Sequence, residues 1–360
     1  MHINNKHYRT IWYDEKSESV KIIDQTRLPF ELKIVTLRNL YDVIQAINSM
    51  KVRGAPLIGA TAAFGVYLAY RDLKNKNKIY EDVQLIKNTR PTAVNLFWAI
   101  DKMMSIVECN LGNNKLEKKL LEEAKNICEN DIKQCKEIGI NGLRVIEEIF
   151  YKKNNKVNIL THCNAGWLAT IDWGTATSPI YQAKKKNIDI HVWVDETRPR
   201  NQGAALTSYE LNNEEVDNTI IADNTAGLLM QRGQIDICIV GADRVTNTGH
   251  VANKIGTFLK AIAAKEFNIP FYVAIPTNTI DWETKNFQQV IIEERSGHEL
   301  SRISGLDSNN KIRTVDIYPT ASKVYNPAFD LTPNSLVESF ITNKGIIKAT
   351  EKGLAKLKDE

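Results

Sequence analysis

The chain has 360 residues, 43% of them hydrophobic and 25% charged, proportions that are typical of a globular protein with room for two domains. Its 47 basic and 43 acidic side chains leave a formal charge of only +4, which gives no support for nucleic acid or an anionic membrane as a partner. The five cysteines show no C-x-x-C spacing and the chain begins without an apolar leader, so we expect a cytoplasmic protein with reduced thiols.

The first part of the chain is expected to be mostly helical, with a small sheet at its start. Three short apolar stretches between residues 10 and 36 are separated by polar and turn residues, a pattern that predicts a small antiparallel sheet. From residue 39 the apolar side chains follow helical spacing. Residues 58–70 form the longest apolar run, which is too short to span a bilayer and predicts a buried helix. Residues 115–150 predict a long amphipathic helix.

The second part predicts an α/β fold of the Rossmann-like, doubly wound type, built on a parallel sheet. Short runs rich in β-branched residues alternate there with helix-compatible segments, such as 170–186 and 253–265. The runs are 157–161, 188–194, 219–222, 235–240, 271–275 and 314–318. We divide the chain into residues 1–130 and 131–360, although the long helix fits either part and residues 153–156 are the best candidate for a linker.

Three polar segments follow predicted strands, at residues 161–166, 195–203 and 241–244. Ligands of doubly wound sheets bind beyond the carboxyl ends of the strands, so we expect these segments to meet at one rim and to form one active site. The sequence has neither G-x-G-x-x-G after a strand nor G-x-x-x-x-G-K-[ST], and no H-E-x-x-H or close Cys/His set. We therefore expect no cofactor and no metal.

Two residues in these segments are candidates for chemistry. Cys163 follows a strand, and its thiol would carry protons or act as a nucleophile if a cation or a helix N-terminus activated it, but most free cysteines are simply buried. Asp243 ends a strongly apolar strand, where a raised pKa would suit an acid or base, but a salt bridge to Arg244 or a helix cap explains it equally well. The residues alone leave both questions open.

Two arginines at predicted helix entries suit an anionic ligand. Arg53 precedes Gly54, Ala55 and a long apolar helix, and Arg90 stands before another helix. A guanidinium can fork onto phosphate oxygens, and free N–H groups at a helix start favour an anion. A tight turn with a surface arginine is the alternative for each element.

Further polar residues also have two explanations. Gln202 ends a charged stretch, which is either part of the site or a solvated loop. Asn253 and Lys254 are expected to open a helix, where they would bind an anion or a sugar hydroxyl, or serve only as a cap and an exposed charge.

Taken together and in this order, these segments resemble the methylthioribose-1-phosphate isomerase family over nearly the whole chain. Each stretch is modestly specific, and the ordered set is highly specific. The matching stretches are Val52-Arg53-Gly54-Ala55-Pro56, Arg90-Pro91-Thr92-Ala93-Val94-Asn95-Leu96, Thr161-His162-Cys163-Asn164-Ala165-Gly166, Asp195-Glu196-Thr197-Arg198-Pro199-Arg200-Asn201-Gln202-Gly203-Ala204, Val240-Gly241-Ala242-Asp243-Arg244, Ala252-Asn253-Lys254-Ile255-Gly256-Thr257, Pro270-Phe271-Tyr272-Val273-Ala274 and Asn326-Pro327-Ala328-Phe329-Asp330.

The resemblance implies a cofactor-independent aldose–ketose isomerase that converts 5-methylthioribose 1-phosphate to 5-methylthioribulose 1-phosphate in methionine salvage. It implies a homodimer, with Cys163 and Asp243 as the catalytic residues. The phosphate blocks simple ring opening, so we expect Asp243 to protonate the ring oxygen or a neighbouring hydroxyl while Cys163 shuttles a proton and hydrogen moves between C1 and C2. The resemblance also implies seven residues around the substrate and its phosphate: Arg53, Gly54, Ala55, Arg90, Gln202, Asn253 and Lys254.

Three alternatives stay open on the same scaffold. The sugar 5-deoxyribose 1-phosphate lacks only the methylthio group, and an apolar pocket separates such groups weakly. Ribose 1,5-bisphosphate would need a further basic group at the C5 end, which the sequence does not locate. A non-catalytic, sugar-phosphate-sensing regulatory subunit is the alternative of another class, because regulatory subunits of the translation initiation exchange factor resemble this family in fold. The presence of both Cys163 and Asp243 argues for catalysis.

Overall fold

A computed structural model of the chain describes residues 1–73, 78–91, 93–284, 287–319 and 321–358. The predicted small antiparallel sheet is confirmed near the start of the chain, where three strands pair in chain order. They are β3 (Ile11–Asp14), β4 (Ser19–Ile23) and β5 (Ile34–Leu37). A separate two-stranded ribbon precedes them, formed by β1 (His2–Ile3) and β2 (Lys6–His7).

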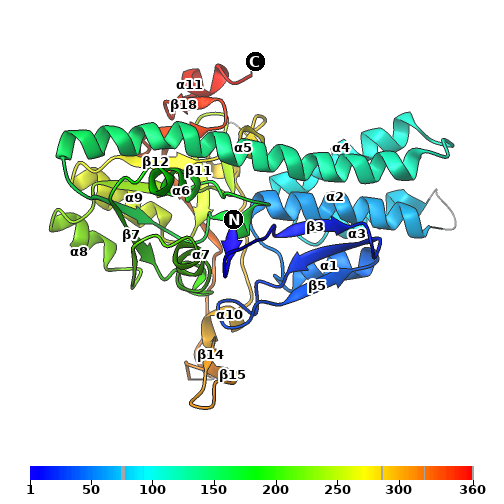
Figure 1. Ribbon diagram of the computed structural model, residues 1–360, viewed down its shortest axis with the longest axis horizontal. Helices are drawn as coiled ribbons and strands as arrows, with labels where there is room; N and C mark the ends of the chain where they lie inside the picture. The colour runs from blue at the N-terminus through cyan, green and yellow to red at the C-terminus, as the bar shows by residue number, and fades with distance from the viewer. Residues whose placement is uncertain (74–77, 92, 285–286, 320, 359–360) are drawn as a thin grey trace.

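The predicted helical part is also confirmed, and it packs against this small sheet (Figure 1). Its central helix, α2, contacts all four of the others and is buried along most of its length. None of the helices in the described ranges is long and apolar enough to cross a membrane. The five helices are α1 (Leu40–Asn48), α2 (Ala55–Asp72), α3 (Ile79–Lys87), α4 (Val94–Cys109) and α5 (Leu116–Lys153).

The long helix α5 joins the two parts of the molecule (Figure 1). Apolar residues near its start, such as Leu120 and Ala124, belong to the core of the helical part. Residues further along, such as Ile138 and Ile146, belong to the core under the large sheet. The division after residue 130 stays a prediction, and it falls inside this continuous helix.

The second part is built on a seven-stranded sheet with the order β18-β17-β12-β9-β6-β7-β8, which confirms the doubly wound prediction. All neighbouring strands are parallel except β18, which pairs antiparallel with β17. The first strand, β6, lies inside the sheet, and the chain builds outward from it in both directions. The strands are β6 (Val157–Thr161), β7 (Ile190–Asp195), β8 (Asn218–Ile221), β9 (Ile237–Val240), β12 (Phe271–Ala274), β17 (Ser339–Thr342) and β18 (Gly345–Ile347).

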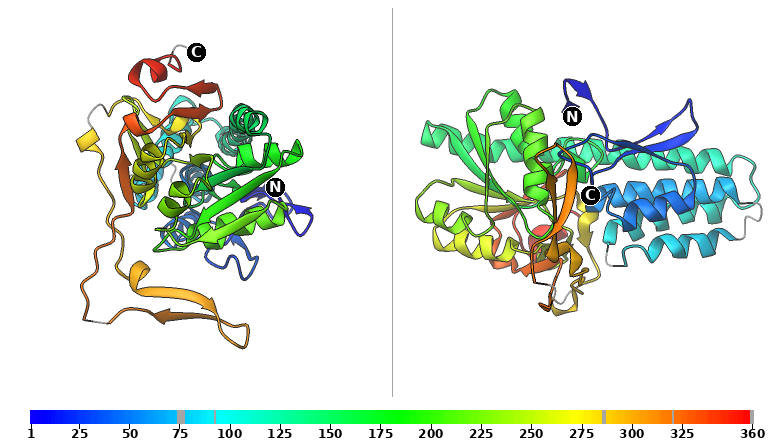
Figure 2. Two further views of the ribbon diagram at one scale, coloured as in Figure 1. Left: turned by 90° about the vertical axis from the view of Figure 1, so that its left-hand side faces the viewer. Right: turned by 90° about the horizontal axis from the view of Figure 1, so that it is seen from below.

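Helices cover both faces of this sheet (Figure 2). Neighbouring residues of a strand point to opposite faces, so Ile159 and Ile239 pack with α5, α6 and α7, whereas Leu160 and Val240 pack with α8, α9 and α11. Burial on both faces explains why these strands read as continuous apolar runs. The helices are α6 (Ser178–Lys185), α7 (Ser208–Asn213), α8 (Ala226–Gln231), α9 (Thr257–Glu266) and α11 (Glu351–Ala355). Shorter turns are η2 (Trp167–Ala169), η3 (Gly203–Thr207), η4 (Thr277–Thr279), η5 (Phe287–Gln289) and η6 (Asn334–Leu336).

A smaller four-stranded sheet corrects one prediction. Asn253 and Lys254 do not open a helix but end strand β11, which pairs with β10 on one side and β16 on the other. The ladder hydrogen bonds of two neighbours decide this local structure, and α9 begins only at Thr257. The sheet has the order β13-β10-β11-β16. Its strands are β10 (Arg244–Thr246), β11 (Val251–Lys254), β13 (Ile280–Asp281) and β16 (Phe329–Thr332).

Two other predicted elements differ from the structure. The helix expected at 170–186 begins only at Ser178, because residues 170–177 form a compact loop around Gly174, which has a φ of 79°. The strand expected at 314–318 is wrong as a member of the parallel sheet. It forms β15 (Ile312–Asp316), which pairs with β14 (Arg302–Leu306) in an exposed hairpin that projects from the body after the short helix α10 (His298–Ser301) (Figure 1).

Candidate active site

Cys163 and Asp243 lie just after two neighbouring strands of the large sheet. Cys163 follows β6 and Asp243 follows β9, and these are the strands between which the chain order reverses. At such a switch point the connections leave in opposite directions, so a crevice opens at the carboxyl ends of the strands. The two candidate residues therefore stand where this fold binds ligands.

Hydrogen bonds from chain-distant threonines hold the backbone of Cys163 in a left-handed conformation, with a φ of 63°. The Cys163 N–H donates to Thr197 Oγ1 at 2.8 Å, and Thr207 Oγ1 donates to the Cys163 carbonyl at 2.7 Å. The thiol donates to Gln202 Oε1 at 3.4 Å. A non-glycine residue keeps this conformation only where its surroundings fix it, so the position of the sulfur is set by the fold.

Burial and nearby cations act against each other at both groups. Burial raises the pKa of the Cys163 thiol, while Arg53 and Lys254 lower it. Burial likewise raises the pKa of Asp243, while Lys254, Arg53 and Arg90 lower it. Each group thus holds its proton more firmly than usual, yet cations stand close enough to stabilise its ionised form. This balance suits a pair that gives and takes protons.

The start of α2 brings a basic residue and free backbone N–H groups to the same place. Arg53 Nη1 donates to Asn164 Oδ1, and its Nη2 donates to the Asn164 carbonyl at 2.7 Å. Gly54 has a φ of 89°, and a Cβ there would lie 2.4 Å from the Ala169 carbonyl oxygen, so only glycine lets α2 approach this loop. Together with Ala55 it presents a helix N-terminus suited to an anion.

Arg90 is buried with its guanidinium only partly paired. Its Nη2 donates to Glu293 Oε2 at 3.2 Å and its Nη1 lies 3.4 Å from Met50 Sδ, whereas its buried Nε has no hydrogen-bond partner among the described residues. An unpaired buried donor is costly, so Arg90 is well placed to bind a ligand oxygen. Thr92, from the same sequence stretch, lies outside the described residues.

All nine predicted site residues line two adjoining hollows, which we call the rim cavity. The cavity lies where the start of α2 meets the carboxyl ends of the strands. Arg90, Gln202 and Lys254 line the first hollow and Asn253 lines the second. Both hollows share Arg53, Gly54, Ala55, Cys163 and Asp243. The role of each residue stays a prediction.

The cavity also contains residues that sequence reasoning missed. Arg295 lies on the irregular segment before the short helix α10 and Glu299 lies on α10 itself, and no motif or periodicity marks either residue. Arg200 stands in one of the family-like stretches, but only the fold shows that it faces the cavity. Apolar side chains complete the lining: Met50, Ile58, Val290, Ile291 and Phe329.

Glu210 on α7 carries no motif, yet it holds the loop that contains Cys163. It is fully buried, and burial raises its pKa to about 7 although its hydrogen bonds lower it. Through Asn164 it is linked to Arg53. Its carboxylate accepts hydrogen bonds from Asn164 Nδ2 at 2.9 Å, Trp167 N at 3.0 Å, Leu168 N at 2.8 Å and Tyr181 OH at 2.9 Å.

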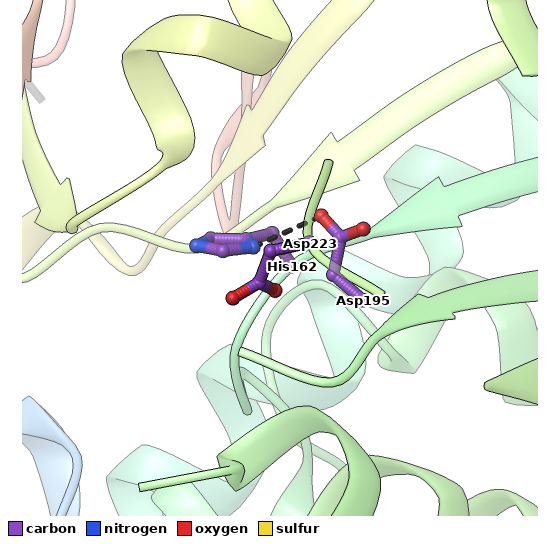
Figure 3. Close-up of side chains that lie close together, drawn as sticks. All are labelled: His162, Asp195 and Asp223. Carbon is purple, nitrogen blue, oxygen red and sulfur yellow. Dashed lines mark hydrogen bonds and ion pairs between the residues drawn. The ribbon is translucent and has the colours of Figure 1, made fainter. Parts of the chain in front are cut away.

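Three further side chains lie close together at the ends of β6, β7 and β8 (Figure 3): His162, Asp195 and Asp223. Their potential ligand atoms lie within 4.8 Å of one another, a spacing that a metal ion could use. His162 Nδ1 lies 3.0 Å from Asp195 Oδ2, and its Nε2 lies 2.9 Å from the Ile255 carbonyl oxygen. The Lys260 ammonium is already 3.0 Å from Asp195 Oδ2. A lysine of the protein therefore already pairs with the Asp195 carboxylate, and His162 links the ends of β6 and β7 to the residue after Lys254.

Comparison with known proteins identifies the family. Residues 51–349 match the initiation factor 2 subunit family. A methylthioribose-1-phosphate isomerase from Methylorubrum populi is 48% identical over 361 residues, which cover 100% of this chain and 99% of the relative. Another from Desulfatibacillum aliphaticivorans is 50% identical over 364 residues, which cover 99% and 98%. The chain belongs to the methylthioribose-1-phosphate isomerases of this family.

Solved structures place this methylthioribose-1-phosphate isomerase family member beside proteins of two kinds. A 5-methylthioribose 1-phosphate isomerase from Pyrococcus horikoshii matches with a TM-score of 0.85 and 38% identity, over 98% of this chain and 96% of the other. The delta subunit of translation initiation factor eIF-2B from A. fulgidus matches with a TM-score of 0.78 and 36% identity, over 97% and 100%. The predicted likeness to both kinds of protein is therefore confirmed.

The family-like stretch 326–330 forms hydrogen bonds to two segments that lie next to the rim cavity. Asp330 accepts hydrogen bonds from Gly256 N at 2.6 Å and Phe258 N at 3.1 Å, which fixes the start of α9 close to Lys254. Asn326 Nδ2 donates to the Ser296 carbonyl at 3.0 Å. In this isomerase family member the stretch thus connects α9 with the segment that carries the missed residues.

Proposed function

We propose that the chain is an aldose–ketose isomerase that converts 5-methylthioribose 1-phosphate to 5-methylthioribulose 1-phosphate, a step of methionine salvage. One observation carries this proposal: a thiol, a carboxyl group and three cations meet at the switch point of the sheet. Relatives of this name match the chain over its full length, which supports the choice of substrate.

Cys163 and Asp243 would move the protons of this reaction. Asp243 donates a proton to the ring oxygen, and the bond between C1 and that oxygen breaks with its electron pair left on oxygen. The hydrogen on C2 moves to C1 together with its bonding electron pair, and the C2 hydroxyl gives its proton to Cys163, which reacts as the thiolate. Arg53 and Lys254 favour the thiolate that accepts it. Return of the proton from Cys163 to Asp243 through solvent closes the cycle, so the balance needs no cofactor.

Binding groups for each part of the substrate are present in the rim cavity. The start of α2 with Arg53, Arg90 and Lys254 would hold the phosphate. Gln202, which accepts the thiol hydrogen bond, and Asn253 would contact sugar hydroxyls. The apolar side chains of the lining would cover the methylthio group, which water solvates poorly.

The proposal is tested with purified protein and no added cofactor. We would measure kcat/KM for 5-methylthioribose 1-phosphate, 5-deoxyribose 1-phosphate and ribose 1,5-bisphosphate. A preference for the first supports the salvage role. Comparable rates for the first two support the broader alternative, which the apolar side chains of the lining favour, because apolar contacts separate such substituents weakly. No turnover of any sugar, together with isolation only in a larger complex, supports the sensing subunit, to which the eIF-2B delta structure gives weight.

We further propose that the enzyme is a cytoplasmic homodimer and that each chain comprises a helical part, residues 1–130, and a Rossmann-like part, residues 131–360. The continuous helix α5 supports joint movement of the two parts, since it contributes to both cores. Light scattering of the purified protein measures the assembly, and a mass of one chain contradicts the dimer.

A further inference from the structure

Among the described residues, six basic side chains line the rim cavity, and five of them fall into two groups, whereas the sixth, Arg244, pairs with Asp281 at 3.4 Å. The first group, Arg53, Arg90 and Lys254, lies close enough to Asp243 to lower its pKa. Arg53 in this group is held by the neutral Asn164, so its charge stays available to a ligand. The second group consists of Arg200 and Arg295, which also line the cavity.

Two carboxylates neutralise the second group. Glu299 Oε1 accepts hydrogen bonds from Arg295 Nε at 3.1 Å and Nη2 at 2.7 Å, and from Arg200 Nη1 at 3.1 Å. Glu293 Oε1 accepts from Arg295 Nη1 at 2.9 Å. Burial alone would raise the pKa of Glu299, but Arg295 and Arg200 lower it, so this carboxylate is ionised at neutral pH. Glu293 is shared with Arg90 of the first group, which donates to its Oε2 at 3.2 Å, so it compensates Arg295 only in part. Glu299 therefore supplies most of the negative charge that Arg200 and Arg295 already face.

The substrate meets the two groups with different ends. Its phosphate is bonded to C1, a reacting atom, and must therefore lie beside Cys163 and Asp243, where the first group is. The C5 substituent stands on the far side of the sugar ring from C1 and reaches the remaining lining, which contains the apolar side chains and the second group. A negative charge on C5 would be brought toward Glu299.

We propose that Glu299, by pairing with Arg200 and Arg295, excludes sugars that carry a second phosphate at C5 and so restricts the cavity to a neutral C5 substituent. This inference rests on the proposed function. Like charges in a partly buried site repel strongly, and the arginines cannot turn to a C5 phosphate while Glu299 holds them. Glu299 thus acts as a specificity-determining residue. The basic group that a bisphosphate would need is present, but it is already ion-paired with Glu299.

The test compares the unmodified protein with Glu299→Gln. The variant keeps the size of the side chain and removes its charge, which takes the ion pair from Arg200 and leaves Arg295 paired with Glu293 alone. We would measure kcat/KM for ribose 1,5-bisphosphate and for 5-methylthioribose 1-phosphate. The ratio of the first to the second should rise by about 10- to 100-fold in Glu299→Gln. An unchanged ratio in a folded variant that still converts the methylthio sugar overturns the proposal.

A matched control separates this effect from net charge. Asp307 on the exposed hairpin pairs with Arg313 Nε at 3.1 Å, so Asp307→Asn removes the same charge from the same kind of pair. The ratio should stay within about 2-fold of the unmodified protein, because this pair is exposed to solvent. A rise equal to that of Glu299→Gln contradicts a local role for Glu299.

Two further measurements keep the inference testable on its own. If Glu299→Gln does not fold, Glu293→Gln removes the other carboxylate on Arg295 and should move the ratio in the same direction. If the unmodified protein converts none of the sugars, the proposed function fails, and calorimetry then compares binding of ribose 1,5-bisphosphate with that of ribose 1-phosphate. Tighter relative binding of the bisphosphate by Glu299→Gln upholds the inference, and equal relative binding overturns it.

Discussion

The connecting helix α5 and the rim of the large sheet each bury a carboxyl group, and the hydrogen bonds around the two groups differ. Burial raises the pKa of both Asp131 on α5 and Glu210 on α7 to about 7. Glu210 accepts four hydrogen bonds that hold the loop containing Cys163. Asp131 accepts one from Ile171 N at 2.9 Å and a weak one from the Cys135 thiol at 3.9 Å. A buried carboxylate at the rim therefore organises the site, whereas the one in α5 mainly costs stability.

The largest expected contrast between the rim and α5 concerns two buried thiols. Cys163→Ala should lower kcat by about 10²- to 10⁴-fold and leave the melting temperature nearly unchanged, because a positioned proton carrier is lost from the cavity. Asp243→Asn should behave in the same way. Cys135→Ala is the matched control in α5, and it should leave kcat unchanged while lowering the free energy of unfolding by about 1 kcal/mol. Full turnover by Cys163→Ala would remove it from the mechanism.

A smaller contrast is expected in the pH dependence of stability. The pKa of Asp131 rises from 3.8 to about 7 on folding. The unfolded chain loses this proton first, so the contribution of Asp131 is unfavourable only above about pH 4 and grows until about pH 7. Asp131→Asn removes this unfavourable contribution to the free energy of unfolding. Its free energy of unfolding should match that of the unmodified protein near pH 4 and exceed it by up to about 4 kcal/mol above pH 7.

Urea unfolding at several pH values between 4 and 8 measures this difference. The activity of Asp131→Asn is the internal control, since the residue does not line the rim cavity. Parallel pH profiles for the two proteins would show that Asp131 stays ionised in the folded chain, and the contrast with Glu210 would then disappear.

The effect of Glu210→Gln on stability should be smaller than that of Asp131→Asn. The amide nitrogen of glutamine would face N–H and O–H groups whose hydrogen bonds the carboxylate now accepts. We therefore expect a loss of about 2–3 kcal/mol in the free energy of unfolding. Because the Cys163 loop would shift, kcat should fall while KM changes less. Circular dichroism confirms that the variant is folded, and kinetics separate kcat from KM. A variant that loses stability but keeps kcat would limit Glu210 to a structural role.

The strands of the large sheet were predictable because burial on both faces leaves a strong local pattern. Runs such as 157–161 and 235–240 are mostly apolar and rich in β-branched residues, so each run favours a strand even without its neighbours in the sheet. The run at 314–318 has the same local character, yet it lies in an exposed hairpin. Strand propensity depends on what a strand packs against, and that is not written in the run itself.

Prediction of the site from the sequence had the same limit. Local patterns marked Cys163 and Asp243 as candidates at strand ends, and the ordered family-like stretches joined them with the basic residues. They did not show Glu299 or Glu210, because a charged residue in an irregular segment or a short helix looks like any surface residue until its partners are known. They also misplaced Asn253 and Lys254, whose strand depends on backbone hydrogen bonds to β10 and β16.

The amino-acid sequence by itself determined the class of fold, the small sheet, the long helix and the family, since each depends on periodicity or on ordered motifs. The tertiary structure alone decided which strands are neighbours and that Cys163 takes a left-handed conformation between two threonines. It also decided that Glu299 forms ion pairs with two arginines of the cavity. The physical reason is that hydrogen bonds and ion pairs between residues far apart in the chain have no local signature, while hydrophobic periodicity does.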